Sequence, residues 1–194
     1  VLINHGLTPQ EIFFYRFLIA YIGIWAISPK HLFADNLKDE LWLVAGGVFG
    51  GSLYFFTENT ALGITQASNV AFIICTAPLL TTILSLLFYK SEKATKGLIY
   101  GSLLALIGVG LVVFNGSVVL KLSPVGDLLT LLAALSWASY SLVIKRMTGR
   151  YPTVFITRKI FFYGVLTILP AFLLHPLQPD FDVLLQPLVL SNLL

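Results

Sequence analysis

The sequence has 194 residues, of which 57% are apolar and only 11% are charged, and its net charge is +3. Ordinary soluble domains carry about 25% charged residues, so this chain has too few charges to cover a globular surface. The composition is typical of a protein that crosses a membrane several times, and we expect a lipid bilayer and no nucleic acid as its partner.

Apolar runs of about 20 residues follow one another along the chain, and each is long enough to cross about 30 Å of hydrocarbon as a helix. The first run follows Thr8 and Pro9, which suit the N-cap and the first residue of a helix. The predicted full spans are residues 9–27, 41–64, 67–89, 97–115, 125–145 and 153–174. A further run begins at residue 183. We therefore predict an all-α fold, a polytopic transmembrane helix bundle with six full spans plus the start of a seventh.

A buried hairpin of a soluble protein is the alternative for residues 67–115. It is disfavoured because the same apolar pattern recurs along the whole chain.

Lysine and arginine residues gather in alternate loops. Loops 28–40, 90–96 and 145–152 hold eight of them, whereas residues 1–8, 65–68, 116–124 and 175–182 hold only Lys121. Because cytoplasmic loops carry an excess of basic residues, we predict that the first set is cytoplasmic and that the protein lies in the cell inner (plasma) membrane.

Two short segments resemble each other, residues 8–16 (TPQEIFFYR) and 151–159 (YPTVFITRK). Each has a proline at the start of a helix and a basic residue about two turns later. Five predicted spans separate them, so the two copies begin on opposite sides of the membrane. An inverted repeat of this kind is a transporter architecture.

Two charged residues lie deep inside predicted spans, Arg16 and Glu58, each about 10 Å below the outer surface at 1.5 Å per residue. A buried ion costs several kcal/mol unless it is paired, and ionisable residues within a membrane are candidates for function. We expect either a pair between them, structural or functional, or two side chains that each extend toward water. Arg158 and Lys159 lie near the cytoplasmic end of their span, and we expect them to extend toward water.

Polar and amphipathic residues within the spans are candidates to line a substrate cavity, with interhelical hydrogen bonds as the alternative role. These candidates are Arg16, Tyr54, Glu58, Asn59, Asn69, Thr76, Pro78, Trp137 and Tyr140. Pro78 is in mid-span and should kink its helix, because it removes one hydrogen bond and clashes with the carbonyl of Ile74. Small residues at every fourth position predict close helix packing at Gly46, Gly47, Gly50, Gly51, Gly97 and Gly101.

No spacing typical of an enzyme site appears in the sequence. The histidines His5, His31 and His175 lie in different loops, and HExxH, CxxC, GxSxG and P-loop patterns are absent. We expect no catalytic residue, no metal site and no cofactor.

An ordered set of motifs resembles the drug/metabolite transporter superfamily in its EamA-type branch. In the first half they are residues 61–68 (ALGITQAS), 76–79 (TAPL), 87–93 (LFYKSEK), Gly97, Gly101 and 108–111 (GVGL). In the second half they are residues 126–129 (GDLL), 132–134 (LAA), 136–138 (SWA) and Tyr140. The resemblance implies ten helices in two inverted five-helix repeats.

On this resemblance, residues 1–116 are the first EamA-like repeat without its first helix, and residues 124–194 are the truncated start of the second. The chain begins without methionine and stops in an apolar run, so we expect it to be part of a longer protein.

The function that the resemblance implies is that of a secondary transporter, in our interpretation an exporter of small metabolites such as amino acids or related compounds. It would work by alternating access, with protons as a candidate coupling ion. A non-transporting membrane assembly subunit, a membrane-embedded enzyme and a channel are the alternatives.

Overall fold

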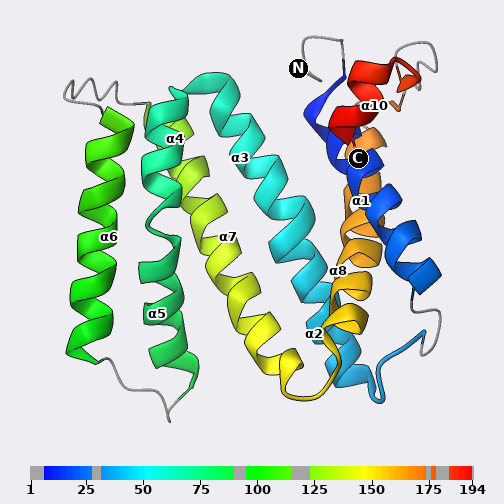
Figure 1. The fold of residues 1–194 in the computed structure, drawn as a ribbon, viewed down its shortest axis with the longest axis horizontal. Coiled ribbons are helices and arrows are strands. Elements are labelled where there is room, and N and C mark those ends of the chain that lie inside the picture. The colour runs from blue at the N-terminus through cyan, green and yellow to red at the C-terminus, as the bar shows by residue number, and fades with distance from the viewer. Residues whose placement is uncertain are drawn as a thin grey trace. The chain divides into compact units, whose positions relative to one another are not determined.

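The computed structural model describes residues 7–27, 32–89, 95–114, 123–173, 176–177 and 184–193. Within these residues the elements are helical (Figure 1). The longer helices are α1 (Pro9–Ile27), α2 (Leu37–Gly47), α3 (Leu53–Ile64), α4 (Ala67–Ile74), α5 (Ala77–Phe88), α6 (Lys96–Phe114), α7 (Pro124–Thr148) and α8 (Thr153–Ile168). The short elements are the π-helical turn η2 (Val48–Ser52), the 3₁₀ turn η3 (Leu169–Leu173) and α10 (Pro187–Leu193).

Among the described residues, four helical segments are long and apolar enough to cross a membrane: Gln10–Ile27, Ala67–Phe88, Pro124–Thr148 and Thr153–Leu173. The apolar helix Lys96–Leu111 is shorter. The predicted all-α membrane bundle is confirmed, whereas the count of six spans plus a seventh stays a prediction. Parts of the predicted loops, including residues 28–31, 90–94 and 178–182, lie outside the described residues.

The helix that enters the predicted span 41–64 begins earlier than expected, at Leu37. Asn36 caps it, because its side-chain oxygen accepts a hydrogen bond from the backbone N–H of Asp39 at 2.8 Å. The polar residues 37–40, predicted as loop, therefore form the first helical turn. The glycine-rich stretch in mid-span widens into η2, a type of turn that is frequent at functional sites.

The predicted kink at Pro78 is confirmed as a break between α4 and α5. Cys75 and Thr76 form a turn there, and Pro78 is the second residue of α5. The hydroxyl of Thr76 donates a hydrogen bond to the carbonyl of Ile73 at 2.6 Å and thereby supports the turn. At the N-terminus of α1, Thr8 and Glu11 form a capping box, as the Thr8-Pro9 pair suggested.

The chain divides into two compact units, unit 1 (Val1–Ser52 and Arg146–Leu194) and unit 2 (Leu53–Lys145). Each unit contains residues from both predicted repeats, and the division of the chain into inverted repeats stays a prediction.

In unit 1, α8 packs against α1 and against α2 with η2. Glycine makes this approach possible: a Cβ atom on Gly47 would lie 2.5 Å from the Cβ of Tyr163, and one on Gly51 would lie 3.3 Å from the Cα of Gly164. Side chains complete the contact, since the hydroxyls of Ser52 and Thr167 are 2.9 Å apart.

In unit 2, α3 and α7 lie side by side (Figure 1). The C-terminal end of α3 is joined to the N-terminal end of α7 because the hydroxyl of Ser123 donates a hydrogen bond to the carbonyl of Ile64 at 3.2 Å. At the other end of α7, Lys145 lies over the ring of Tyr89, 5.0 Å from its centroid, which links α7 to the end of α5.

The predicted packing glycines fall into two groups. Gly46, Gly47, Gly50 and Gly51 are buried in α2 and η2. Around Gly97 and Gly101 on α6, no atom of the described residues lies within 4 Å of an added Cβ. A packing role for these two glycines stays a prediction.

Candidate functional site

Four of the nine predicted cavity residues meet in unit 2. Tyr54 and Glu58 are one turn apart on α3, and Trp137 and Tyr140 are one turn apart on α7. Residues three or four positions apart share a face of a helix, so each pair presents one continuous surface. We call these four residues the aromatic–carboxylate cluster.

Direct contacts join the members of the aromatic–carboxylate cluster. The hydroxyl of Tyr54 donates a hydrogen bond to Oε1 of Glu58 at 3.0 Å. The ring of Trp137 is tilted against those of Tyr54 and Tyr140, with centroid distances of 5.0 Å and 5.3 Å. Such offset aromatic pairs are favourable beyond the area that they bury. The cluster is thus a strip of three rings that ends in a carboxylate.

The cluster lies inside the predicted spans 41–64 and 125–145, and its first member, Tyr54, is the second residue of α3 and directly follows η2 and Leu53. Trp137 is near the middle of the 25-residue helix α7, and Glu58 is six residues from the end of α3 at Ile64. Trp137 is 41% exposed, and the other three side chains are half-buried. Within the described residues the cluster therefore offers an accessible aromatic surface beside an acid.

The other candidates in unit 2 make local contacts. Asn59 donates to the carbonyl of Phe55 at 2.7 Å, and Thr76 contacts Ile73 as described above. Asn69 is 3% exposed near the start of α4, and Pro78 is exposed on α5. A cavity-lining role for these residues stays a prediction.

The suggested pair of Arg16 and Glu58 stays a prediction as well. Arg16 is exposed on α1 in unit 1, whereas Glu58 belongs to unit 2 and is hydrogen-bonded to Tyr54.

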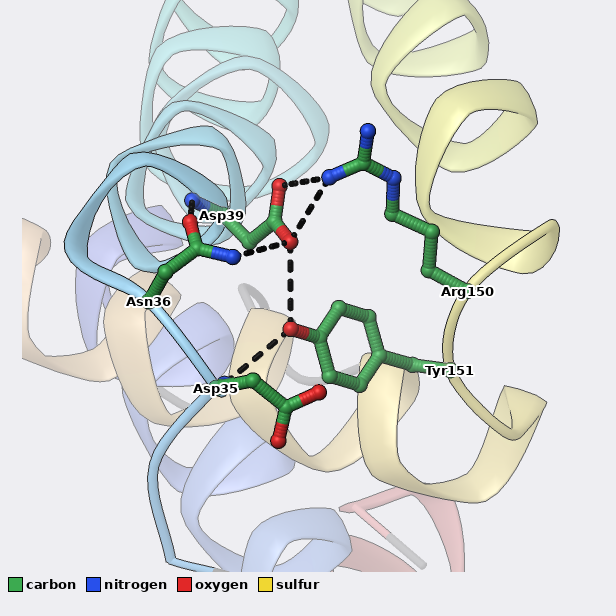
Figure 2. A network of polar contacts seen from close by, with 5 residues as sticks. All are labelled: Asp35, Asn36, Asp39, Arg150 and Tyr151. Carbon is green, nitrogen blue, oxygen red and sulfur yellow. Dashed lines mark hydrogen bonds and ion pairs between the residues drawn. The ribbon is translucent and has the colours of Figure 1, made fainter.

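A polar network that the sequence analysis did not identify lies in unit 1, where the loop before α2 meets the turn between α7 and α8 (Figure 2). Nη1 of Arg150 donates to both carboxylate oxygens of Asp39, at 2.8 Å and 2.9 Å. The hydroxyl of Tyr151 donates to Oδ2 of Asp39 at 3.1 Å and accepts the backbone N–H of Asp35 at 3.0 Å. Asn36 adds a bond from Nδ2 at 2.9 Å.

The donors around Asp39 decide its ionisation. Burial opposes the charged form, but hydrogen bonds from Asn36, Arg150 and Tyr151 outweigh it and hold the pKa of Asp39 below its ordinary value. Asp39 is therefore a carboxylate at neutral pH, and it fixes the first turn of α2 to the residues between α7 and α8.

A second ion pair in unit 1, formed by the residue after Asp39, is more deeply buried than the first. The ammonium of Lys159 pairs with Glu40, whose other hydrogen-bond donors are the hydroxyl of Tyr163 and the backbone N–H of Ala34, the latter at 2.7 Å. Lys159 also donates to the carbonyl of Leu32 at 3.1 Å. Burial opposes ionisation of Glu40, but the bonds from Lys159 and Tyr163 outweigh it and lower its pKa.

This arrangement corrects the sequence interpretation of α8. Arg158 and Lys159 were expected to extend toward the cytoplasmic surface, as basic residues near a span end usually do. Both are buried instead, at 2% and 3% exposure. The signal that indicates the pairing is complementary charge on loops of the same predicted side, with acids in residues 35–40 and bases in residues 146–159.

No group of three or more His, Cys, Asp or Glu side chains that could hold a metal ion occurs among the described residues. The aromatic–carboxylate cluster has one acid and the networks of unit 1 have acids paired with bases, so neither fits a metal.

Comparisons with known proteins cover most of the chain. Residues 2–114 match the model of the EamA-like transporter family. The chain is 32% identical over 149 residues to "Uncharacterized transporter YdfC" of Bacillus subtilis, covering 75% of this chain and 47% of that protein. It is 27% identical to an "Uncharacterized transporter" of Archaeoglobus fulgidus, covering 84% of this chain and 57% of the relative. The chain thus spans about half the length of the curated relatives it matches.

A solved structure, described only as the crystal structure of a protein, has the same fold. It matches with a TM-score of 0.70 and 20% sequence identity, over 91% of this chain and 64% of that one.

Proposed function

Since this chain belongs to the EamA-like transporter family, we propose that it acts within a secondary transporter that exports small metabolites, such as amino acids or related compounds, by alternating access. Protons are the coupling ion in this proposal, and the inner (plasma) membrane is its location. The observation that carries it is the aromatic–carboxylate cluster of Tyr54, Glu58, Trp137 and Tyr140.

The cluster suits a carrier because it combines binding surface with a titratable group. Aromatic rings supply contact area for a small organic solute, and a polar end of the solute meets the carboxylate. Burying an acid inside a membrane costs free energy, so the position of Glu58 within a predicted span favours a role in solute or proton binding. A site near the middle of its predicted spans could be reached in turn from either side, as alternating access requires.

The network around Asp39 supports the predicted orientation. It joins loop 28–40 to loop 145–152 through Arg150 and Tyr151. This contact favours a position of both loops on one side of the membrane, and their basic residues favour the cytoplasm as that side.

Counterflow in liposomes tests this proposal against a channel, an assembly subunit and an enzyme. Liposomes that contain the complete protein are loaded with a mixture of unlabelled amino acids and diluted into the same mixture with a trace of radiolabel. We expect transient accumulation of label above equilibrium, because an alternating-access carrier exchanges solute across the membrane. A channel gives equilibration without overshoot, and a scaffold or an enzyme gives no flux above empty liposomes; either result contradicts the proposal.

A further inference from the structure

The chemistry of the aromatic–carboxylate cluster selects for the charge of its ligand. Within the described part of unit 2, the hydroxyl of Tyr54 is the hydrogen-bond partner of Glu58, and no lysine or arginine forms an ion pair with that carboxylate. The described basic residues of unit 2 are Lys96, at the start of α6, and Lys145, whose ammonium is 3.3 Å from Oγ of Ser85. Among the described residues of its unit, an ionised Glu58 therefore has a hydrogen bond but no counter-charge.

The rings beside Glu58 favour a positive ligand for a second reason. The face of an aromatic ring is negative, and tryptophan attracts a cation more strongly than tyrosine or phenylalanine does. Trp137 is the central ring of the strip, in contact with both tyrosines, and it is 41% exposed. A cation that lies over Trp137 and contacts the carboxylate would meet negative potential on both sides.

The same surroundings disfavour an anion. Glu58 repels a carboxylate or phosphate, and the cluster has no basic side chain to compensate. An uncharged solute would contact the rings but would leave Glu58 without a counter-charge in a medium of low dielectric.

We propose that the aromatic–carboxylate cluster binds an organic cation, an ammonium group that carries an apolar or aromatic substituent, with Glu58 as its counter-charge and Trp137 as the ring over which the cation lies. This inference rests on the proposed function, because it names the class of solute that the carrier takes. Tyr54 acts as a positioning residue, since its hydroxyl holds one oxygen of Glu58 and leaves the other for the ligand.

Binding of matched probes tests the inference. The complete protein in nanodiscs is titrated by calorimetry with phenethylamine and benzyltrimethylammonium as cations, 2-phenylethanol as the neutral analogue and 3-phenylpropanoate as the anion. We expect at least one cation to bind roughly tenfold or more tightly than 2-phenylethanol, and 3-phenylpropanoate to bind more weakly still. Equal affinity for the cations and the alcohol, or tighter binding of the anion, overturns the inference.

Variants assign the binding to the cluster. Glu58→Gln and Trp137→Leu should each weaken cation binding about tenfold, and Trp137→Phe should recover part of the loss because it keeps a ring. Tyr100→Leu is the matched control, since Tyr100 is a 68% exposed aromatic residue on α6 outside the cluster. If Glu58→Gln folds poorly, the difference in cation affinity between Trp137→Leu and Trp137→Phe still tests whether the cation binds at the cluster. Unchanged cation affinity in the Trp137→Leu variant contradicts the assignment.

The inference and the proposed function can fail separately. Charge-selective binding without counterflow of any solute would support the cation site but would refute the proposal that the protein is a carrier. Counterflow of amino acids that is the same in the parent and in Glu58→Gln, without preference for cations, would retain the carrier and refute the cation site.

Discussion

The buried pair of Glu40 and Lys159 predicts a measurable coupling energy in unit 1. Removing one partner of a buried ion pair costs about 3–5 kcal/mol, because the other charge is left behind. In Lys159→Met the stranded Glu40 keeps two donors, the hydroxyl of Tyr163 and the backbone N–H of Ala34. We therefore expect the lower end of that range, about 3 kcal/mol.

The double variant should lose less stability than the two single variants lose together. In Glu40→Gln with Lys159→Met no charge is stranded, and the methionine fills the space of the lysine stem among the rings of Phe33, Phe162 and Tyr163. We expect a coupling of about 2 kcal/mol between the two positions.

Thermal unfolding in detergent measures this cycle. A loss of 1 kcal/mol lowers Tm by about 2–4 °C for a protein of this size, so Lys159→Met should lose roughly 6–12 °C. Lys38→Met is the control, because Lys38 is an exposed lysine on α2, and it should change Tm little. Additive losses in the double variant, within about 0.5 kcal/mol, would show that the two charges do not stabilise each other and would refute this account of unit 1.

Three further predictions follow from the fold. Gly47→Ala should destabilise the protein by about 1–3 kcal/mol, because the new methyl overlaps α8. Gly63→Ala, whose added methyl has nothing within 4 Å, should be neutral or slightly stabilising in the same thermal assay. Equal effects of the two substitutions would contradict the close approach of Gly47 to α8. The folded pKa of Asp39 is below its ordinary value of 3.8, so the stability that ionised Asp39 contributes is complete above pH 3.8 and is lost as pH falls through the folded pKa. The Tm difference between the parent and Asp39→Asn should therefore shrink on acidification below about pH 4. A Tm difference that grows there would contradict this assignment of the pKa. In a background without the native cysteine, Gly149→Cys should resist an impermeant maleimide in intact cells and Gln66→Cys should react; the reverse labelling would invert the topology.

The helical architecture followed from the sequence because a bilayer leaves few alternatives. Runs of about 20 apolar residues can satisfy their backbone hydrogen-bonding groups in a membrane only as helices or closed barrels. The limits of the apolar runs therefore predict the limits of the helices, and α1, α7 and α8 begin within a residue of the predicted starts. The break at Pro78 was predictable for a similar local reason, since proline removes a hydrogen bond wherever it lies in a helix.

The site was predictable only in part. The spacing of Tyr54 with Glu58, and of Trp137 with Tyr140, fixes which residues share a helix face. Residue spacing does not specify which helix faces pack against each other. The contact between Tyr54 and Trp137 was therefore established only by the structure.

The pairs in unit 1 were missed because their members are more than 100 residues apart in sequence. Lys159 near a span end is by itself indistinguishable from a lysine that extends into water. The π-helical turn at Val48–Ser52 has no sequence signal that separates it from α-helix.

The central claim is that a carried solute binds at the aromatic–carboxylate cluster, and the initial rate of counterflow in the Glu58→Gln variant tests it most directly. The measurement compares liposomes with equal amounts of folded parent, Glu58→Gln and Tyr100→Leu protein. The account predicts overshoot in the parent and in Tyr100→Leu, and a rate at least about tenfold lower in Glu58→Gln. Equal rates in the parent and in Glu58→Gln would contradict it and would place the solute elsewhere in the protein.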